Sequence, residues 1–175
     1  LDLYQNVFLC ARKKSGKTSC IFKMLKEICT RETKVYLFVS TLYKDKGWIN
    51  VRKYLDMKHI EYEGHTSLKN GKDDILQTIV SNLEHEAQDR ELKGAGDNVE
   101  DELPIILAGN GDEEEEEKPR KTRFRAPEFV FVFDDLSTEL KSRSVTALLK
   151  KNRHFLATCL VSSQFLLDIE PQARK

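Results

Sequence analysis

Apolar and polar positions along this chain follow two patterns, compact apolar runs and apolar residues at helical spacing. The compact runs predict strands buried on both faces; they are residues 4–10, 34–39, 129–133 and 155–161, with a further short strand at 59–62. The helical spacing predicts helices; these cover residues 17–30, 49–57, 73–91 and 138–151, with a polar loop at 40–47. Because strands alternate with helices, we expect an α/β domain whose central sheet is mostly parallel and flanked by helices.

The composition changes between residues 93 and 122. This segment contains the runs GAGDNVEDELP and GNGDEEEEEKP, with one brief apolar patch at residues 105–107. Acidic runs and several glycines predict a disordered or loosely ordered insertion. A basic stretch follows at residues 118–125 (KPRKTRFR), and we interpret it as a solvated neighbour of the acidic run rather than as a DNA contact. The fold resumes after it, so we expect residues 1–175 to form a single domain.

Chain length and charge limit the number of domains and the kinds of partner that we expect. With 175 residues, the chain is long enough for one domain with a substantial core. Lys plus Arg equals Asp plus Glu at 29 each, so bulk charge gives no argument for nucleic-acid binding. No apolar run is long enough to span a bilayer, and we expect no membrane association. The chain opens almost directly into a strand, which suggests a fragment of a longer protein.

The strongest motif is the segment ARKKSGKT at residues 11–18, between a predicted strand and a predicted helix. It follows the Walker A pattern of nucleotide-binding proteins, except that Ala11 replaces the first glycine and restricts the backbone there. In such a loop the backbone amides surround a phosphate, and Gly16 permits its close approach. Lys17 would reach the β- and γ-phosphates of ATP, and the Thr18 hydroxyl would bind Mg²⁺. The remaining candidate nucleotide-binding residues are Lys13, Lys14, Ser15 and Ser19. A chance match of GKT in a basic loop is the alternative.

Two carboxylates follow the most apolar strand, in the segment FVFVFDD. A buried strand that ends in acidic residues beside the phosphate loop is typical of a Walker B motif. Asp134 would hold Mg²⁺, commonly through water, and Asp135 would polarise the attacking water. An acidic pair that only caps the next helix is the alternative interpretation.

Two polar or aromatic residues remain open on the pattern alone. Gln164 follows the strand at 155–161 and could contact the γ-phosphate, provided that this strand lies between the two motif-bearing strands. A simple capping role for Gln164 is slightly favoured by the residues themselves. Trp48 either packs near the nucleotide or closes the loop after the second strand.

Taken together, four segments resemble the A32-like packaging ATPases of poxviruses, within the FtsK–HerA superfamily. They are ARKKSGKTS, STLYKDKGW, FVFDDL and RHFLATCLVSSQ, in this order along residues 4–170. Relatives occur in large DNA viruses, virophages and Maverick/Polinton elements. The resemblance implies a RecA-like sheet with an inserted strand, the fold of the ASCE class of P-loop NTPases. It implies a Mg²⁺-dependent ATPase with Asp135 as the catalytic carboxylate, Asp134 as the metal-linked acid and Gln164 as the sensor.

The same resemblance implies partners and a location. It implies a homo-oligomeric ring that drives double-stranded viral DNA into a capsid, through a capsid or portal-like protein, at an assembly site in the host cytoplasm or transiently at the virion. Such rings usually take an arginine from a neighbouring subunit. Arg153 is our first candidate, Arg143 is another, and Arg12 would act from its own loop.

Two other functions stay open on the sequence. A non-motor P-loop protein, such as a nucleotide-dependent switch or a small-molecule kinase, would share the loop motif. We see no Arg-rich lid of the kind that a kinase carries. A protein that binds ATP without turnover is the third alternative.

Overall fold

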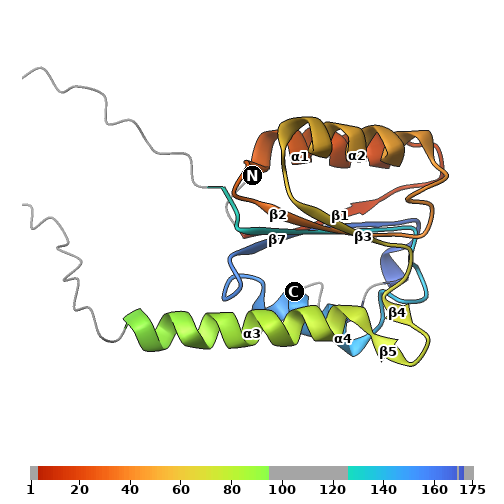
Figure 1. Cartoon of the computed structure of the whole chain (residues 1–175). Helices are drawn as coiled ribbons and strands as arrows, with labels where there is room; N and C mark the ends of the chain where they lie inside the picture. Colours follow the sequence, from red (N-terminus) through yellow and green to blue (C-terminus); the bar gives the residue numbers. More distant parts are fainter. Residues whose placement is uncertain (1–3, 95–125, 169, 172–175) are drawn as a thin grey trace, which may run out of the picture.

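A five-stranded parallel sheet forms the centre of the molecule (Figure 1). The computed structural model describes residues 4–94, 126–168 and 170–171. The strands in chain order are β1 (Asn6–Cys10), β2 (Lys34–Val39), β3 (Tyr62–His65), β6 (Phe129–Asp134) and β7 (Ala157–Ser163). Their order across the sheet is β1-β7-β6-β2-β3, and every neighbouring pair is parallel. All five strands therefore end at the same edge of the sheet, called the carboxyl edge below.

Helices cover both faces of this sheet, as Figure 1 shows. One face carries α1 (Lys17–Ile28) and α2 (Lys46–Lys58), and the other carries α3 (Ile75–Gly94) and α4 (Arg143–Lys151). A short antiparallel pair, β4 (Lys69–Asn70) and β5 (Asp73–Asp74), precedes α3, and a 3-10 turn (Leu166–Asp168) follows β7. The predicted α/β class with a mostly parallel, helix-flanked sheet is confirmed.

The alternating side chains of β6 explain why the strand is apolar throughout. Phe131 and Phe133 point to the layer of α3 and α4, where they stack on Tyr36 and Phe38 of β2 at ring distances of 4.8 and 5.4 Å. The valines between them join the cluster under α1 and α2. Each face of a strand covered by helices on both sides must be apolar, because neither face meets water.

Several element boundaries differ from the predicted ones. The loop at 40–47 is shorter than expected, because Asp45 caps α2 by accepting a hydrogen bond from the Gly47 amide at 2.6 Å. The strand predicted at 59–62 lies three residues later. His59 ends α2 in a left-handed conformation and delays that strand.

The helix predicted at 138–151 begins only at Arg143, because Ser142 caps it by accepting from the Val145 amide at 3.3 Å. Leu136 and Leu140, which precede this helix, are buried from turns. The strand predicted at 155–161 runs instead from 157 to 163.

The predicted insertion at 93–122 lies outside the described residues, apart from the last two residues of α3, and so does the whole basic stretch at 118–125. Over the part of the chain that the structure describes, no helix is both long and apolar enough to cross a bilayer.

Candidate functional site

The segment at residues 11–18, called the GKT loop below, leaves β1 at the carboxyl edge and leads into α1. Gly16 precedes α1 with a left-handed backbone (φ 87°, ψ 14°), and Lys14 is also left-handed (φ 61°). These two residues turn the chain back on itself, so that α1 starts beside the end of β1. Gly16 has no side chain to cap the helix, and the first turn contains no acidic residue. The first amides of α1 are therefore available to an anion, and the helix dipole favours one.

Ala11 does not strain this loop. The backbone amide of Ala11 donates to the carbonyl of Ser163 at 3.2 Å, which continues the pairing of β1 with β7 by one residue. Its φ is not in the left-handed region, which the loop reserves for Lys14 and Gly16. Alanine restricts the backbone more than the usual glycine would, but Ala11 adopts an ordinary conformation that alanine allows.

Lys17 folds back over the loop. Its Nζ donates to the carbonyl of Ala11 at 2.6 Å and to the carbonyl of Arg12 at 3.1 Å. Both partners are neutral, and within the described residues Lys17 forms no salt bridge. Its charge is therefore not neutralised by a carboxylate. Arg12, Lys13 and Lys14 are exposed around it, so the loop is strongly basic.

Asp134 is the buried acid of the site. It ends β6 and is 7% exposed, and Trp48 Nε1 donates to its Oδ2 at 2.9 Å. Burial raises the pKa of the Asp134 carboxyl above its ordinary value. Neighbouring Ser162, Trp48 and the charge of Lys17 oppose that rise in its pKa. The strand that leads into the GKT loop and the strand that ends in Asp134 have only β7 between them, although Lys17 and Asp134 are 117 positions apart in sequence.

Ser162 stands beside Asp134 in the sheet, because the two are register partners of β7 and β6. Its hydroxyl oxygen is buried and makes no hydrogen bond of good geometry. It is close enough to lower the pKa of Asp134 but is not aligned as a donor to it. A buried hydroxyl without a partner is costly. This hydroxyl is thus a polar group that a ligand or water at the carboxylate could satisfy.

The first turn of α2 joins the GKT loop to Asp134. A Cβ built on Gly47 would lie 3.0 Å from Cγ2 of Thr18 and 2.9 Å from Oδ1 of Asp45. A glycine therefore lets α2 approach the first turn of α1 closely, and any side chain here would have to displace Thr18 or Asp45. The next residue, Trp48, is fully buried and reaches Asp134. Thr18, Gly47, Trp48 and Asp134 form one continuous set of contacts.

Three strand ends converge on Asp135. This residue is exposed and left-handed (φ 57°), a conformation that Asp tolerates better than most residues. Its Oδ2 accepts from Ser40 Oγ after β2, and its Oδ1 accepts from Gln164 Nε2 after β7, both at 3.4 Å. Because β7 lies between β1 and β6, Gln164 sits between the GKT loop and the carboxylates.

The turn after β7 presents Gln164 to this edge. The Ser163 hydroxyl accepts from the Phe165 amide at 3.2 Å and also donates to the Asp168 carboxylate. The Gln164 carbonyl lies 3.7 Å from Sγ of Cys10, at the end of β1. Gln164 is therefore held beside the start of the GKT loop from its backbone, and its side chain is directed to Asp135.

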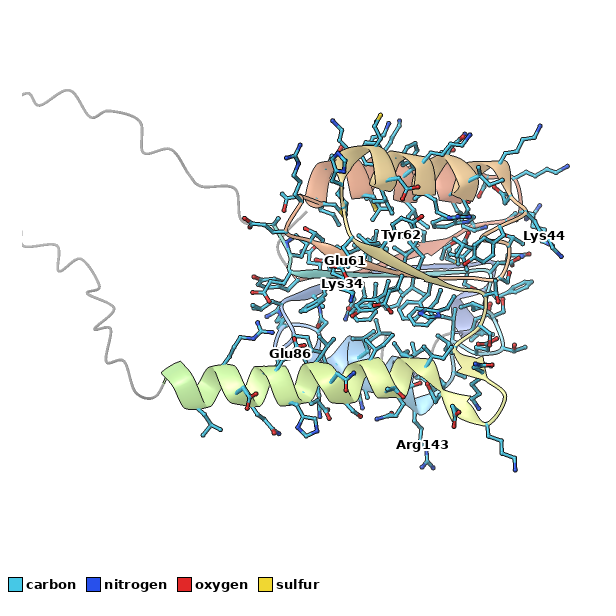
Figure 2. All side chains as sticks on the ribbon, in the orientation of Figure 1. Lys34, Lys44, Glu61, Tyr62, Glu86 and Arg143 are labelled. Atoms are coloured by element: carbon cyan, nitrogen blue, oxygen red, sulfur yellow. The ribbon has the colours of Figure 1, made fainter. Side chains whose placement is uncertain are left out.

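The predicted arginines lie apart from this cluster. Arg153 is exposed in the turn that precedes β7, at the opposite edge of the sheet from the carboxylates. Arg143 begins α4 and points away from the sheet (Figure 2). Neither lies beside the carboxylates of its own chain. Arg12 alone belongs to the GKT loop.

A cation at this site would depend on few protein ligands. Among the described residues, no three His, Cys, Asp or Glu side chains gather as a metal-binding group. Mg²⁺ commonly keeps several waters and takes only one or two carboxylates together with substrate phosphates. One buried carboxylate, Asp134, is enough for a cation that needs so few protein ligands. Its pKa is raised by burial, and the hydroxyl of Ser162 beside it has no hydrogen-bond partner. Asp134 and the Thr18 hydroxyl are the residues that could make it.

Three residues of the cluster could not be assigned from the sequence. Trp48 was left open between two roles, and the structure places its indole N–H against Asp134. Ser40 and Ser162 lie in two of the segments that carry the resemblance, but neither was singled out, because a serine at a strand end is common. Their position next to strand-end carboxylates in the sheet is the signal that could have found them. No protein-family model, no curated protein and no solved structure matches this chain, so its function has to be argued from this geometry.

Proposed function

We propose that this chain is a Mg²⁺-dependent ATPase of the P-loop class. One observation carries the proposal: the basic, amide-rich GKT loop and the buried Asp134 lie at one edge of a parallel sheet, with only β7 between their strands, and α2 contacts both through Gly47 and Trp48. A triphosphate needs amides, a lysine and a carboxylate-bound cation together. This cluster offers the amides, the lysine and the carboxylate.

The sheet order supports the finer assignment to the RecA-like, inserted-strand class. The strand that carries Gln164 lies between the strand of the GKT loop and the strand of Asp134. This is the condition under which a polar residue after β7 can contact both the γ-phosphate and the attacking water. The hydrogen bond between Gln164 and Asp135 supports the same role.

Each residue has a definable task in hydrolysis. Lys17 would exchange its two carbonyl partners for phosphate oxygens, and the first amides of α1 would surround the β-phosphate. Asp135, exposed at the strand end, would orient the attacking water and accept its proton. Gln164 would hold the same water from the other side. Asp134 and Thr18 would hold Mg²⁺, which when bound neutralises charge on the triphosphate.

The motor function rests on the resemblance to packaging ATPases rather than on this geometry. We propose that the chain acts in a homo-oligomeric ring that moves double-stranded DNA into a capsid. The isolated sites would lack the neighbour's arginine and would turn over slowly, because Arg153 and Arg143 lie away from their own carboxylates.

ATPase activity, measured with and without double-stranded DNA, tests the proposed hydrolysis and the proposed motor function. We expect Mg²⁺-dependent hydrolysis that DNA stimulates. Lys17→Ala and Asp135→Asn should each lower kcat by about 100-fold or more, since each removes a group that acts on the reacting phosphate or water. Lys23→Ala, an exposed lysine of α1, and Asp56→Asn, an exposed acid of α2, are controls with matched charge changes.

The outcomes separate the alternatives. Hydrolysis that DNA does not stimulate, in any oligomeric state, favours the non-motor switch or kinase. Nucleotide binding without hydrolysis favours a binding protein. Hydrolysis that survives Lys17→Ala would remove the GKT loop from the reaction and refute the assignment to the P-loop class.

A further inference from the structure

Trp48 is buried in α2, yet its one polar atom is directed at the acid of the site. The side chain is fully buried, and its Nε1 lies 2.9 Å from Oδ2 of Asp134. We infer that Trp48 is a positioning residue of the proposed site, which holds one oxygen of Asp134 so that the other is directed to a bound cation and its waters. This inference rests on the proposed function and adds α2 to the site.

The start of α2 is built to hold this indole in place. Asp45 caps the helix through the Gly47 amide, and the absence of a side chain at Gly47 lets the helix pack against Thr18. The backbone around Trp48 is thus held between the cap and the first turn of α1. A donor held by packing on both sides loses little freedom when it forms its hydrogen bond.

The chemistry of the donor matters as much as its position. An indole N–H is neutral, so it can orient Asp134 without cancelling the negative charge that a cation needs. Across the described residues, Asp134 forms no salt bridge. Ser162 beside it is also neutral, and Lys17 acts on Asp134 only through its charge, without an ion pair. A lysine or arginine in place of Trp48 would compete with the cation instead. The site therefore orients its acid without pairing it to a fixed cation.

Packing alone does not account for the residue. Val51 and Leu55, on the same buried face of α2, fill the core without any polar atom. A phenylalanine at position 48 would likewise fill much of the volume but would carry no donor. The substitution Trp48→Phe thus separates the hydrogen bond from the packing, and Leu55→Ala removes packing from the same helix far from Asp134.

Nucleotide binding measured with and without Mg²⁺ tests the inference. For Trp48→Phe we expect the Mg²⁺ concentration that half-saturates nucleotide binding to rise about 10- to 100-fold, as for other residues that orient a metal ligand. ATP binding without Mg²⁺ should change little, because the GKT loop is intact. Leu55→Ala should lower the melting temperature and leave the Mg²⁺ dependence unchanged.

A second measurement avoids any loss of folding in the variant. Trp48 is the only tryptophan of the chain, so its emission reports on this site in the unmodified protein. We expect Mg²⁺, added in the presence of nucleotide, to change this emission, and Asp134→Asn to abolish the Mg²⁺-dependent part of the change.

The results distinguish the inference from the proposed function. If the unmodified protein binds ATP in a Mg²⁺-dependent manner, but Trp48→Phe shows the same Mg²⁺ dependence or the emission is insensitive to Mg²⁺, the positioning role is wrong and the ATPase proposal stands. If the unmodified protein binds no nucleotide at all, both are overturned.

Discussion

Asp134 is a charge placed where water cannot solvate it well. Burial raises the pKa of its carboxyl, and the neutral donors and Lys17 only partly oppose this. A buried carboxylate lowers the free energy of unfolding, and functional sites commonly contain such destabilising groups. The loss of stability caused by Asp134 can be measured separately from activity.

We therefore expect Asp134→Asn to stabilise the nucleotide-free protein at pH 7 while it abolishes Mg²⁺-dependent hydrolysis. The folded-state pKa is raised, so the folded protein binds the proton more tightly than the unfolded chain does. The penalty is absent below the unfolded pKa of about 4 and grows as the pH rises through the raised folded value. Each kcal/mol gained should raise Tm by about 2–4 °C.

Thermal unfolding of both proteins without Mg²⁺, at pH 7 and at pH 4, checks this expectation. The advantage of Asp134→Asn should be present at pH 7 and should shrink at pH 4. A variant that melts below the unmodified protein at pH 7 would contradict it, and would mean that the bond from Trp48 stabilises the charged carboxylate more than burial disfavours it.

Asp135 combines a reactive group with an uncommon backbone conformation (φ 57°). Asn visits this conformation nearly as readily as Asp, whereas Ala does so at a cost of about 1–2 kcal/mol. We expect Asp135→Asn and Asp135→Ala to lose hydrolysis equally. Only Asp135→Ala should also lose stability, measured by chemical denaturation. Equal stability of the two variants would show that the turn relaxes when the carboxylate is removed.

At the scale of elements, α2 is packed more tightly against the site than its sequence suggests. Gly47 has an ordinary helical backbone, so its conformation does not require glycine. A glycine inside a helix costs about 0.5–1 kcal/mol relative to alanine. The available space accounts for it, because a Cβ would meet Thr18 and Asp45.

Gly47→Ala should accordingly improve the helix but displace Thr18. We expect an ATPase with an unchanged or slightly higher Tm and a Mg²⁺ requirement raised about 10-fold, in line with other changes near a metal ligand. Steady-state hydrolysis over a Mg²⁺ series, together with a melting curve, gives both quantities. Full activity at the original Mg²⁺ level would indicate that the Thr18 methyl moves aside without consequence for its hydroxyl.

At the scale of the whole molecule, the parallel sheet assembles the site from distant parts of the chain. The GKT loop, Asp134 and Gln164 follow three neighbouring strands in the order β1-β6-β7 along the chain and β1-β7-β6 across the sheet. Arg143 and Arg153 are on other surfaces, whereas Arg12 lies in the GKT loop. The completion of the proposed site by an arginine of a neighbouring subunit stays a prediction, which mixing of variants can test.

If Arg153 serves a neighbouring subunit, two inactive variants should restore activity when mixed. Lys17→Ala subunits keep the arginine, and Arg153→Ala subunits keep the nucleotide site. With random assembly into a ring of identical interfaces, about one quarter of the interfaces would pair both intact parts. We expect ATPase activity to return on mixing and to rise with protein concentration, since assembly is bimolecular or higher.

Arg12→Ala is the control for this experiment, because it alters the loop that belongs to the same site as Lys17. Arg143→Ala, tested in the same way, asks whether the second candidate acts instead. Turnover per subunit that is independent of protein concentration, with no recovery in any mixture, would contradict a shared site.

The sequence by itself determined the fold class and most of the candidate residues, for a physical reason. Strands covered on both faces must be apolar throughout, so their positions could be read from local composition, and β2 was predicted to the residue. The GKT loop could also be recognised from the sequence, because its glycine and its lysine belong to one short segment. The first residues of helices were harder to predict. Asp45 and Ser142 set them by accepting hydrogen bonds from backbone amides, and the sequence pattern does not show those bonds.

Only the tertiary structure decided which of these residues meet. The order of strands depends on how the helices cross the sheet, and nothing local in sequence states that β7 lies between β1 and β6. The same order brings Ser162 beside Asp134 and Gln164 to Asp135, and the packing of α2 on α1 brings in Trp48. These contacts join residues far apart along the chain, so they follow from long-range packing and not from any local pattern.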